Sequence, residues 1–125
     1  MAINIEVIIS KLEYKVNELT IRNAKLKKLG IIKDRLEATY RCELRKEFLR
    51  LSLNNTKISI TGDITRDNAK IAQLRLNRDL AKIRYYLMKS SIENIKFEIE
   101  VLRSILIWLR VEFSILKDEE VTWLN

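Results

Sequence analysis

Apolar residues in the second half of the chain recur alternately every three and every four positions. Starting from Ile71, this stepping visits fourteen positions, and thirteen of them are apolar. Such an a/d heptad pattern, held for more than six heptads, predicts one long helix over about residues 65–117. The fourteen positions are Ile71, Leu74, Arg78, Ala81, Tyr85, Met88, Ile92, Ile95, Ile99, Leu102, Leu106, Leu109, Phe113 and Leu116.

The first half of the chain carries a looser stripe with the same spacing, which predicts a helix over about residues 3–53. After Gly30 the stripe continues in a different phase. We therefore expect Gly30 either to kink this helix or to split it in two. The stripe consists of Ile5, Ile9, Leu12, Val16, Leu19, Asn23, Leu26 and Leu29, followed by Ile32, Leu36, Tyr40, Leu44, Phe48 and Leu51.

Residues 54–64 are predicted to connect the two helices. Asn54 can end the first helix, since asparagine tolerates a left-handed cap. Apolar and polar residues alternate over 57–61, which is compatible with a short strand. Asp63 or Thr65 is expected to cap the second helix, because aspartate and threonine side chains accept hydrogen bonds from the first free backbone N–H groups.

A single connection between two helices of similar length predicts a simple all-α fold. The second helix should run back along the first as a long antiparallel, coiled-coil-like hairpin, and residues 1–125 should form one helical domain. The chain has only two glycines and no proline, which agrees with few, long elements. With the fold point at residue 59 or 60, residue i should face about residue 119 minus i.

Charge is distributed unevenly along this predicted hairpin. The chain carries +7 overall. Residues 22–89, which form the loop half, hold 18 basic and 7 acidic residues and carry +11, whereas the half with both termini carries −4. A charge needed only for solubility has no reason to segregate in this way, so the loop half is expected to face an acidic partner such as nucleic acid.

The basic half supplies candidate nucleic-acid contacts. Tyr86 lies off the apolar seam among these basic residues, where an aromatic ring can stack on an unpaired base. The alternative is a solvated helix face with local pairs such as Glu43–Lys46 and Glu47–Arg50. The candidate residues are Arg41, Arg45, Lys46, Arg50, Lys57, Arg66, Lys70, Arg75, Lys82, Tyr86 and Lys89.

Arg78 interrupts the apolar seam, and we expect it to pair with Glu37 or Glu43 across the hairpin and to fix the register.

The half with both termini has more apolar residues than one partner helix can cover. This surplus predicts a homo-oligomeric bundle of hairpins. The candidate oligomer-interface residues are Ile5, Ile9, Ile105, Trp108, Phe113 and Trp123.

Residues that carry out catalysis are scarce in this sequence. Histidine is absent, Cys42 is the single cysteine, and no glycine-rich phosphate loop or CxxC pair occurs. We therefore expect no catalytic residue, metal site or cofactor, and a binding protein rather than an enzyme.

Apolar runs stay well below 18 residues and the first residues do not resemble a signal peptide, so we expect a soluble cytoplasmic protein without membrane contact.

Three segments resemble a group of small helical proteins encoded by bacteriophages and found among phage recombination genes. They are Leu74–Tyr86, Ile95-Lys96 and Trp108–Phe113, and the layout of residues 36–113 is similar to that of phage recombination mediators. The resemblance implies an oligomeric, non-enzymatic accessory protein that binds single-stranded DNA in recombination or replication. It also implies a recombinase as partner and the cytoplasm of a bacterial host cell as location.

Two other functions fit the same sequence. One is a small phage interaction protein that inhibits a host defence complex, as an anti-CRISPR protein does. Its complex would survive nuclease and high salt, whereas phosphate contacts weaken steeply as salt rises. The other is a purely structural coiled-coil oligomer, which would have no affinity for nucleic acid.

Overall fold

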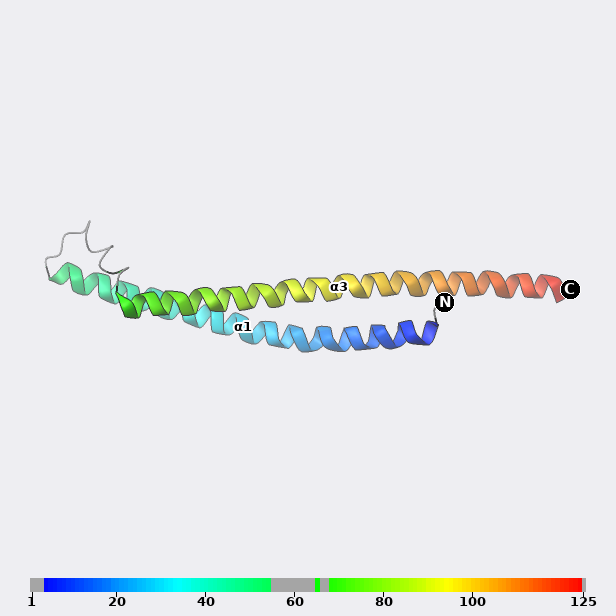
Figure 1. Ribbon diagram of the computed structural model, residues 1–125, viewed down its shortest axis with the longest axis horizontal. Coiled ribbons are helices and arrows are strands. Elements are labelled where there is room, and N and C mark those ends of the chain that lie inside the picture. The colour runs from blue at the N-terminus through cyan, green and yellow to red at the C-terminus, as the bar shows by residue number, and fades with distance from the viewer. Residues whose placement is uncertain (1–3, 55–64, 66–67, 125) are drawn as a thin grey trace. The chain divides into compact units, whose positions relative to one another are not determined.

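The structure, a computed structural model, describes residues 4–54, 65 and 68–124. Two long helices account for nearly all of them: α1 spans Ile5–Leu53 and α3 spans Ala69–Leu124 (Figure 1). They pack against each other in antiparallel directions, which confirms the predicted all-α hairpin. The second helix extends further than the predicted end at about residue 117, and the part of the chain described contains no strand.

Asparagine side chains cap both helices. The Oδ1 atom of Asn4 accepts a hydrogen bond from the backbone N–H of Glu6 at 2.9 Å. The Oδ1 atom of Asn68 accepts one from Lys70 at 2.9 Å and one from Ile71 at 3.3 Å. Each cap satisfies backbone donors that have no partner within the helix.

The second helix therefore begins at Ala69, after the cap on Asn68, rather than at about residue 65. Several sequence predictions for the connection lie outside the described residues. These are the short strand over 57–61 and the capping role of Asp63.

The chain divides into two compact units, and each contains a section of both helices. Unit 1 consists of residues 1–23 and 90–125, and unit 2 consists of residues 24–89. In unit 1 the core holds Ile92, Ile95 and Ile99 of α3, together with Ile8 of α1, all of which are buried.

Polar contacts also join the helices of unit 1. The ammonium of Lys15 on α1 lies 2.5 Å from the carboxylate of Glu98 on α3. Two turns further along the interface, the guanidinium of Arg22 donates to the hydroxyl of Ser91. These two pairs fix the register of α1 against α3 in this unit.

In unit 2, Leu51, Ile71 and Ala81 are buried. Gly30 lies where the Tyr85 ring approaches α1: a Cβ atom added at Gly30 would stand 3.4 Å from Cε2 of that ring. The helix continues without a break through Gly30, so the predicted alternative of two separate helices is wrong.

The phase shift predicted at Gly30 is also absent, because Lys33 rather than Ile32 faces α3. The Lys33 ammonium lies 5.1 Å from the centre of the Tyr85 ring, and Ile32 is exposed. A lysine can occupy such a position because its aliphatic stem packs while its charge reaches water. Elsewhere on α1, Ile8 is buried in place of the predicted Ile9, and Val16 is exposed.

Contacts between the helices define the register of each unit. In unit 2 the paired residue numbers add up to 113 for Glu43 and Lys70, 115 for Glu37 and Arg78, and 119 for Glu37 and Lys82, a range that includes the predicted value of about 119. In unit 1, the numbers of Lys15 and Glu98 add up to 113, so the register there lies about six residues below the predicted 119.

This register explains where the α3 seam ends. Residues 71–109 of the seam are buried or half-buried, but Phe113 and Leu116 are exposed. Ile5, the first residue of α1, is opposite about residue 108 of α3, so the last two seam positions lie beyond the helix that would cover them.

Candidate nucleic-acid interface

The two units differ in the sign of their charge. Unit 2 contains 17 basic and 7 acidic residues, a net charge of +10. Unit 1 contains 7 basic and 10 acidic residues, a net charge of −3. The segregation expected from the sequence is thus a property of two structural units, and unit 2 is the candidate interface.

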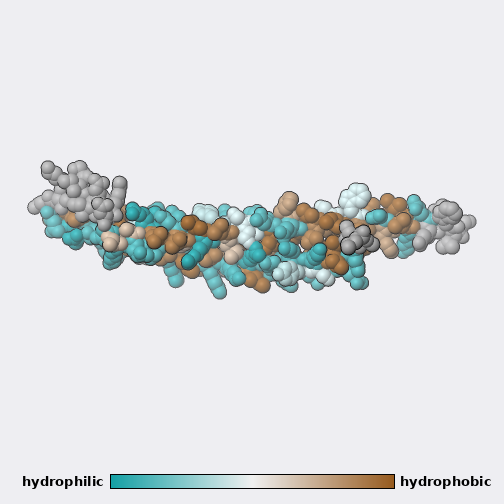
Figure 2. Space-filling model, in the orientation of Figure 1, coloured by the Kyte–Doolittle hydropathy of each residue, from teal (hydrophilic) through white to brown (hydrophobic). Residues whose placement is uncertain are grey.

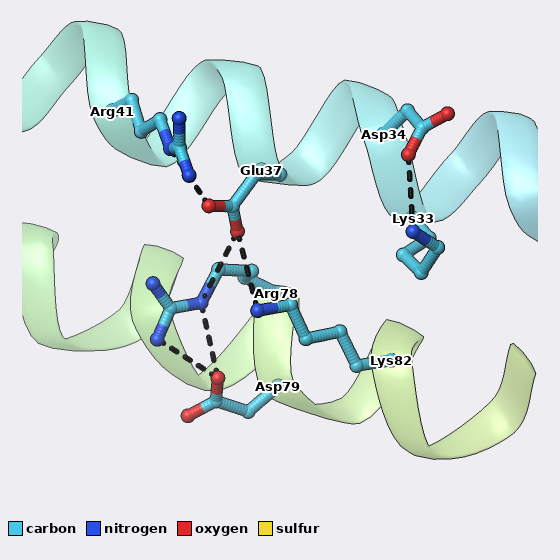
Figure 3. A network of polar contacts seen from close by, with 7 residues as sticks. All are labelled: Lys33, Asp34, Glu37, Arg41, Arg78, Asp79 and Lys82. Carbon is cyan, nitrogen blue, oxygen red and sulfur yellow. Dashed lines mark hydrogen bonds and ion pairs between the residues drawn. The ribbon is translucent and has the colours of Figure 1, made fainter. Parts of the chain in front are cut away.

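The carboxylate of Glu37 on α1 contacts three basic side chains in unit 2 (Figure 3). The Oε1 atom of Glu37 accepts a hydrogen bond from Nε of Arg41 at 2.8 Å. Its Oε2 atom lies 3.5 Å from Nε of Arg78 and 3.7 Å from Nζ of Lys82, both on α3. Asp79 supplies a second carboxylate, 2.9 Å from Nη2 of Arg78. Three cations therefore share two carboxylates, and the cluster keeps one positive charge.

The predicted pairing of Arg78 with Glu37 is confirmed by this geometry. The Arg78 guanidinium also lies 4.3 Å from the centre of the Tyr40 ring, a cation–π contact. Partial desolvation raises the pKa of Glu37, but the hydrogen bond from Arg41 and the charges of Lys82 and Arg78 outweigh it. The net result is a pKa below the ordinary range, so the carboxylate stays ionised.

Glu43 and Glu47 neutralise further cations. Glu43 lies 3.5 Å from the ammonium groups of both Lys46 and Lys70. Glu47 lies 2.6 Å from Nη2 of Arg50. The hydrogen bond from Arg50 holds the pKa of Glu47 below its ordinary range.

Every acidic side chain that the structure describes in unit 2 forms an ion pair. Asp34 contacts Lys33 at 3.1 Å, so each of the five carboxylates in the described part of this unit has at least one cation. Eight basic residues in the same part form no ion pair there, and seven of them are exposed. They are Lys25, Lys27, Lys28, Arg35, Arg45, Arg75, Arg84 and Lys89, and Arg75 is half-buried.

Four residues of α3 form a row on one face of the helix. Arg75, Lys82 and Lys89 are seven residues apart, so they repeat about every 10 Å along the axis. Tyr86 lies between the last two and is 55% exposed. Its ring packs edge-on against Tyr85, with the ring centres 5.3 Å apart. The exposed ring of Tyr86 is therefore positioned by its contact with Tyr85 and lies among basic side chains.

A shallow groove of about 240 Å³ lies on another face of unit 2. Arg84 borders it, and because Arg84 follows Lys82 by two residues, the two side chains point about 200° apart around α3. The walls are mostly apolar, with Asn77 as a polar group. The lining residues are Leu29, Ile32 and Leu36 of α1 and Asn77, Leu80, Ala81 and Arg84 of α3.

The predicted nucleic-acid contacts fall into three groups. Arg41, Lys46, Arg50, Lys70 and Lys82 contact carboxylates of the chain itself. A second group, Arg45, Arg75 and Lys89, forms no ion pair in the described part of the chain, and Tyr86 is exposed. The remaining two, Lys57 and Arg66, lie outside the described residues.

The contacts predicted from the sequence omitted five of the unpaired cations, namely Lys25, Lys27, Lys28, Arg35 and Arg84. A signal was available, since three of them follow one another closely on α1 before Gly30 and no acidic residue occurs between Arg22 and Lys33. Helical spacing leaves these cations without an acidic neighbour one turn away on their own helix.

The predicted oligomer interface lies in unit 1. Trp108 is 73% exposed and Phe113 is 62% exposed, while Ile9 is exposed and Ile5 and Ile105 are half-buried. The Trp123 side chain lies outside the described part of the chain. In Figure 2, hydrophobic surface is visible along the C-terminal part of α3.

Among the described residues, no helix has a stretch long and apolar enough to cross a membrane, and no group of three or more acidic or cysteine side chains is placed to hold a metal ion. Comparison with known proteins gives no match to a family model, to a curated protein or to a solved structure.

Proposed function

We propose that this chain is a non-enzymatic nucleic-acid-binding protein that holds single-stranded DNA on unit 2. The observation that carries the proposal is the excess of unpaired cations: eight basic side chains remain after every described carboxylate of the unit has its ion pair. A phosphate backbone supplies a regular row of negative charges for such a surface, and its neutralisation releases counterions.

Single strands are proposed over duplexes because of Tyr86. Its exposed ring stands between Lys82 and Lys89, and stacking on the face of a base needs an unpaired base. The two neighbouring cations can hold the phosphates on either side of that base. The role in recombination or replication is part of the proposal, and it depends on the resemblance to phage proteins alone.

The test is binding of a labelled single strand of ~40 nucleotides to the full chain, measured by fluorescence anisotropy at about 50 and 200 mM salt. The variant Lys28→Gln, Arg35→Gln, Arg45→Gln removes three exposed, unpaired cations of unit 2. We expect affinity to fall about tenfold or more at 50 mM salt. If all three side chains contact phosphate, the slope of log K against log salt should decrease in magnitude by about 2.

The matched control is Lys11→Gln, Arg110→Gln, Lys117→Gln, which removes three exposed, unpaired cations from unit 1. Net charge changes equally in both variants. Equal losses of affinity would mean that only total charge matters and would contradict a site on unit 2. Absence of binding by the wild-type chain at 50 mM salt would overturn the proposal and leave a structural coiled coil or a protein-directed interaction.

A further inference from the structure

Opposite its buried seam, α3 carries a second heptad stripe in unit 1. This outer stripe consists of Ser90, Asn94, Phe97, Val101, Ser104 and Trp108, spaced alternately by four and three residues, and all six are exposed. Phe97 is 71% exposed and Trp108 is 73% exposed. Val111 and Ile115 continue the same spacing and are exposed as well. A helix with two such stripes can pack against one helix on each side.

We propose that the outer stripe binds the outer stripe of a second copy of this chain, with the two α3 helices antiparallel and related by a two-fold axis. In the proposed register, residue i of one copy faces about residue 198 minus i of the other. Phe97 then faces Val101, Asn94 faces Ser104, and Ser90 faces Trp108. A two-fold axis requires such a self-complementary surface, because each contact occurs twice.

The six residues fit this arrangement by polarity and by size. Asn94 and Ser104, two of the three polar members, meet each other, so the amide can bond to the hydroxyl. Ser90 leaves room for Trp108. The neighbouring heptad registers, with sums of 191 and 205, would place the Asn94 amide opposite Phe97 or Val111. Those registers would bury a polar group without a partner, which costs free energy.

A shallow groove of about 580 Å³ lies on this face. Four of its lining residues, Phe97, Glu100, Val101 and Ser104, are spaced at i, i+3, i+4 and i+7 on α3. Four residues of this kind form the hole that receives one side chain from a facing helix in a coiled coil. In the proposed register, the ring of Phe97 from the second copy enters this hole at the level of Val101.

Charges beside the stripe are compensated within each copy. On one flank, Glu100 approaches its own counterpart, but Nη1 of Arg103 on the same helix lies 3.5 Å from each Glu100. On the other flank, Glu98 approaches its own counterpart, but each Glu98 is held by Lys15 of its own α1 at 2.5 Å. A parallel pair would instead place Glu93 beside Glu98 of the second copy and would stack Trp108 on Trp108 and serine on serine.

Sedimentation equilibrium of the full chain tests whether the pair forms. We expect a dimer of twice 14.8 kDa. Replacing either Phe97→Ser or Trp108→Ser should raise the dimer dissociation constant at least ~30-fold with helicity unchanged by circular dichroism. The control Tyr14→Ser, Ile21→Ser removes two exposed apolar side chains of α1 in the same unit and should leave the dimer intact. A monomer at ~100 µM, or a dimer that both stripe variants retain, would overturn the proposal.

Cysteine cross-linking tests the register. In a Cys42→Ser background, the double variant Asn94→Cys, Ser104→Cys should form an intermolecular disulfide under mild oxidation, because each new thiol faces the other type in the second copy. Neither single variant should cross-link. Cross-linking of the Asn94→Cys variant alone would indicate a parallel pair and would overturn the antiparallel register. Loss of DNA binding in the charge variants of unit 2 is a separate result and does not bear on this dimer.

Discussion

The Nε atom of Arg78 lies 3.5 Å from the carboxylate of Glu37 on the facing helix. Arg78 occupies an a position of the α3 seam, with its side chain 19% exposed, and it covers the Tyr40 ring. A charged residue in a seam stabilises a hairpin less than an apolar residue does, but it disfavours registers in which its charge would have no partner. We infer that this pair selects the register of unit 2.

Two substitutions of Arg78 should therefore have different effects on stability. Arg78→Leu continues the apolar seam and leaves Glu37 with Arg41 and Lys82, so the free energy of unfolding should stay within about 1 kcal/mol of wild type or rise. Arg78→Glu adds a carboxylate beside Glu37 and Asp79, and should lower the free energy of unfolding by about 1–3 kcal/mol. Urea unfolding followed by circular dichroism measures both. A large loss with Arg78→Leu would show that the ion pair stabilises the fold itself.

Stability should depend on pH through Glu37 and Glu47, whose pKa values in the folded chain are below the ordinary range. A lowered folded-state pKa contributes stability above the ordinary glutamate pKa of about 4.3, and this contribution is lost as pH falls through the lower value. We expect the melting temperature of wild type to exceed that of Glu37→Gln, Glu47→Gln at pH 6, and the difference to shrink towards pH 3. A difference that stays constant with pH would contradict this assignment.

The sequence predicted those features that depend on repeated apolar spacing. Both helices, their antiparallel pairing and the Arg78–Glu37 contact follow from it. The inward face of α1 did not, because Lys15, Arg22 and Lys33 occupy positions on that face. Their aliphatic stems pack between the helices while their charged ends contact polar groups. Lys15 contacts Glu98, Arg22 contacts Ser91 and Lys33 contacts Asp34. A pattern that counts only apolar residues shifts by one position at such sites and places Val16 or Ile32 inside.

The candidate interface was predictable in its location but not in its residues. The net charge of each segment identified the basic unit, because this charge can be counted from the sequence alone. Which cations remain unpaired depends on the register between helices: Lys70 meets Glu43, 27 residues earlier in the chain. A shift in register reassigns such pairs, so the predicted set contained Lys70 and Lys82, whose carboxylate partners lie on the other helix.

Gly30→Ala should stabilise the chain. Gly30 lies in the interior of α1, where glycine is less favourable than alanine by about 0.5–1 kcal/mol. The added Cβ would meet the Tyr85 ring at 3.4 Å, an ordinary packing distance. We expect the urea midpoint to rise with no change in the dependence of unfolding free energy on urea. A lower midpoint would mean that the Tyr85 ring needs the space above Gly30.

Tyr86 should distinguish single-stranded from duplex DNA if unit 2 binds as proposed. Tyr86→Ser removes the ring that stands between Lys82 and Lys89 and keeps both cations, so the affinity for a ~40-nucleotide single strand should fall about fivefold to a hundredfold. Affinity for a duplex of the same length should change less than twofold, since paired bases offer no free face to the ring. Tyr86→Phe keeps the ring and its edge-on contact with Tyr85, and should bind single strands as wild type does. Equal losses on both DNAs with Tyr86→Ser would assign the ring a packing role and leave the phosphate contacts without strand preference.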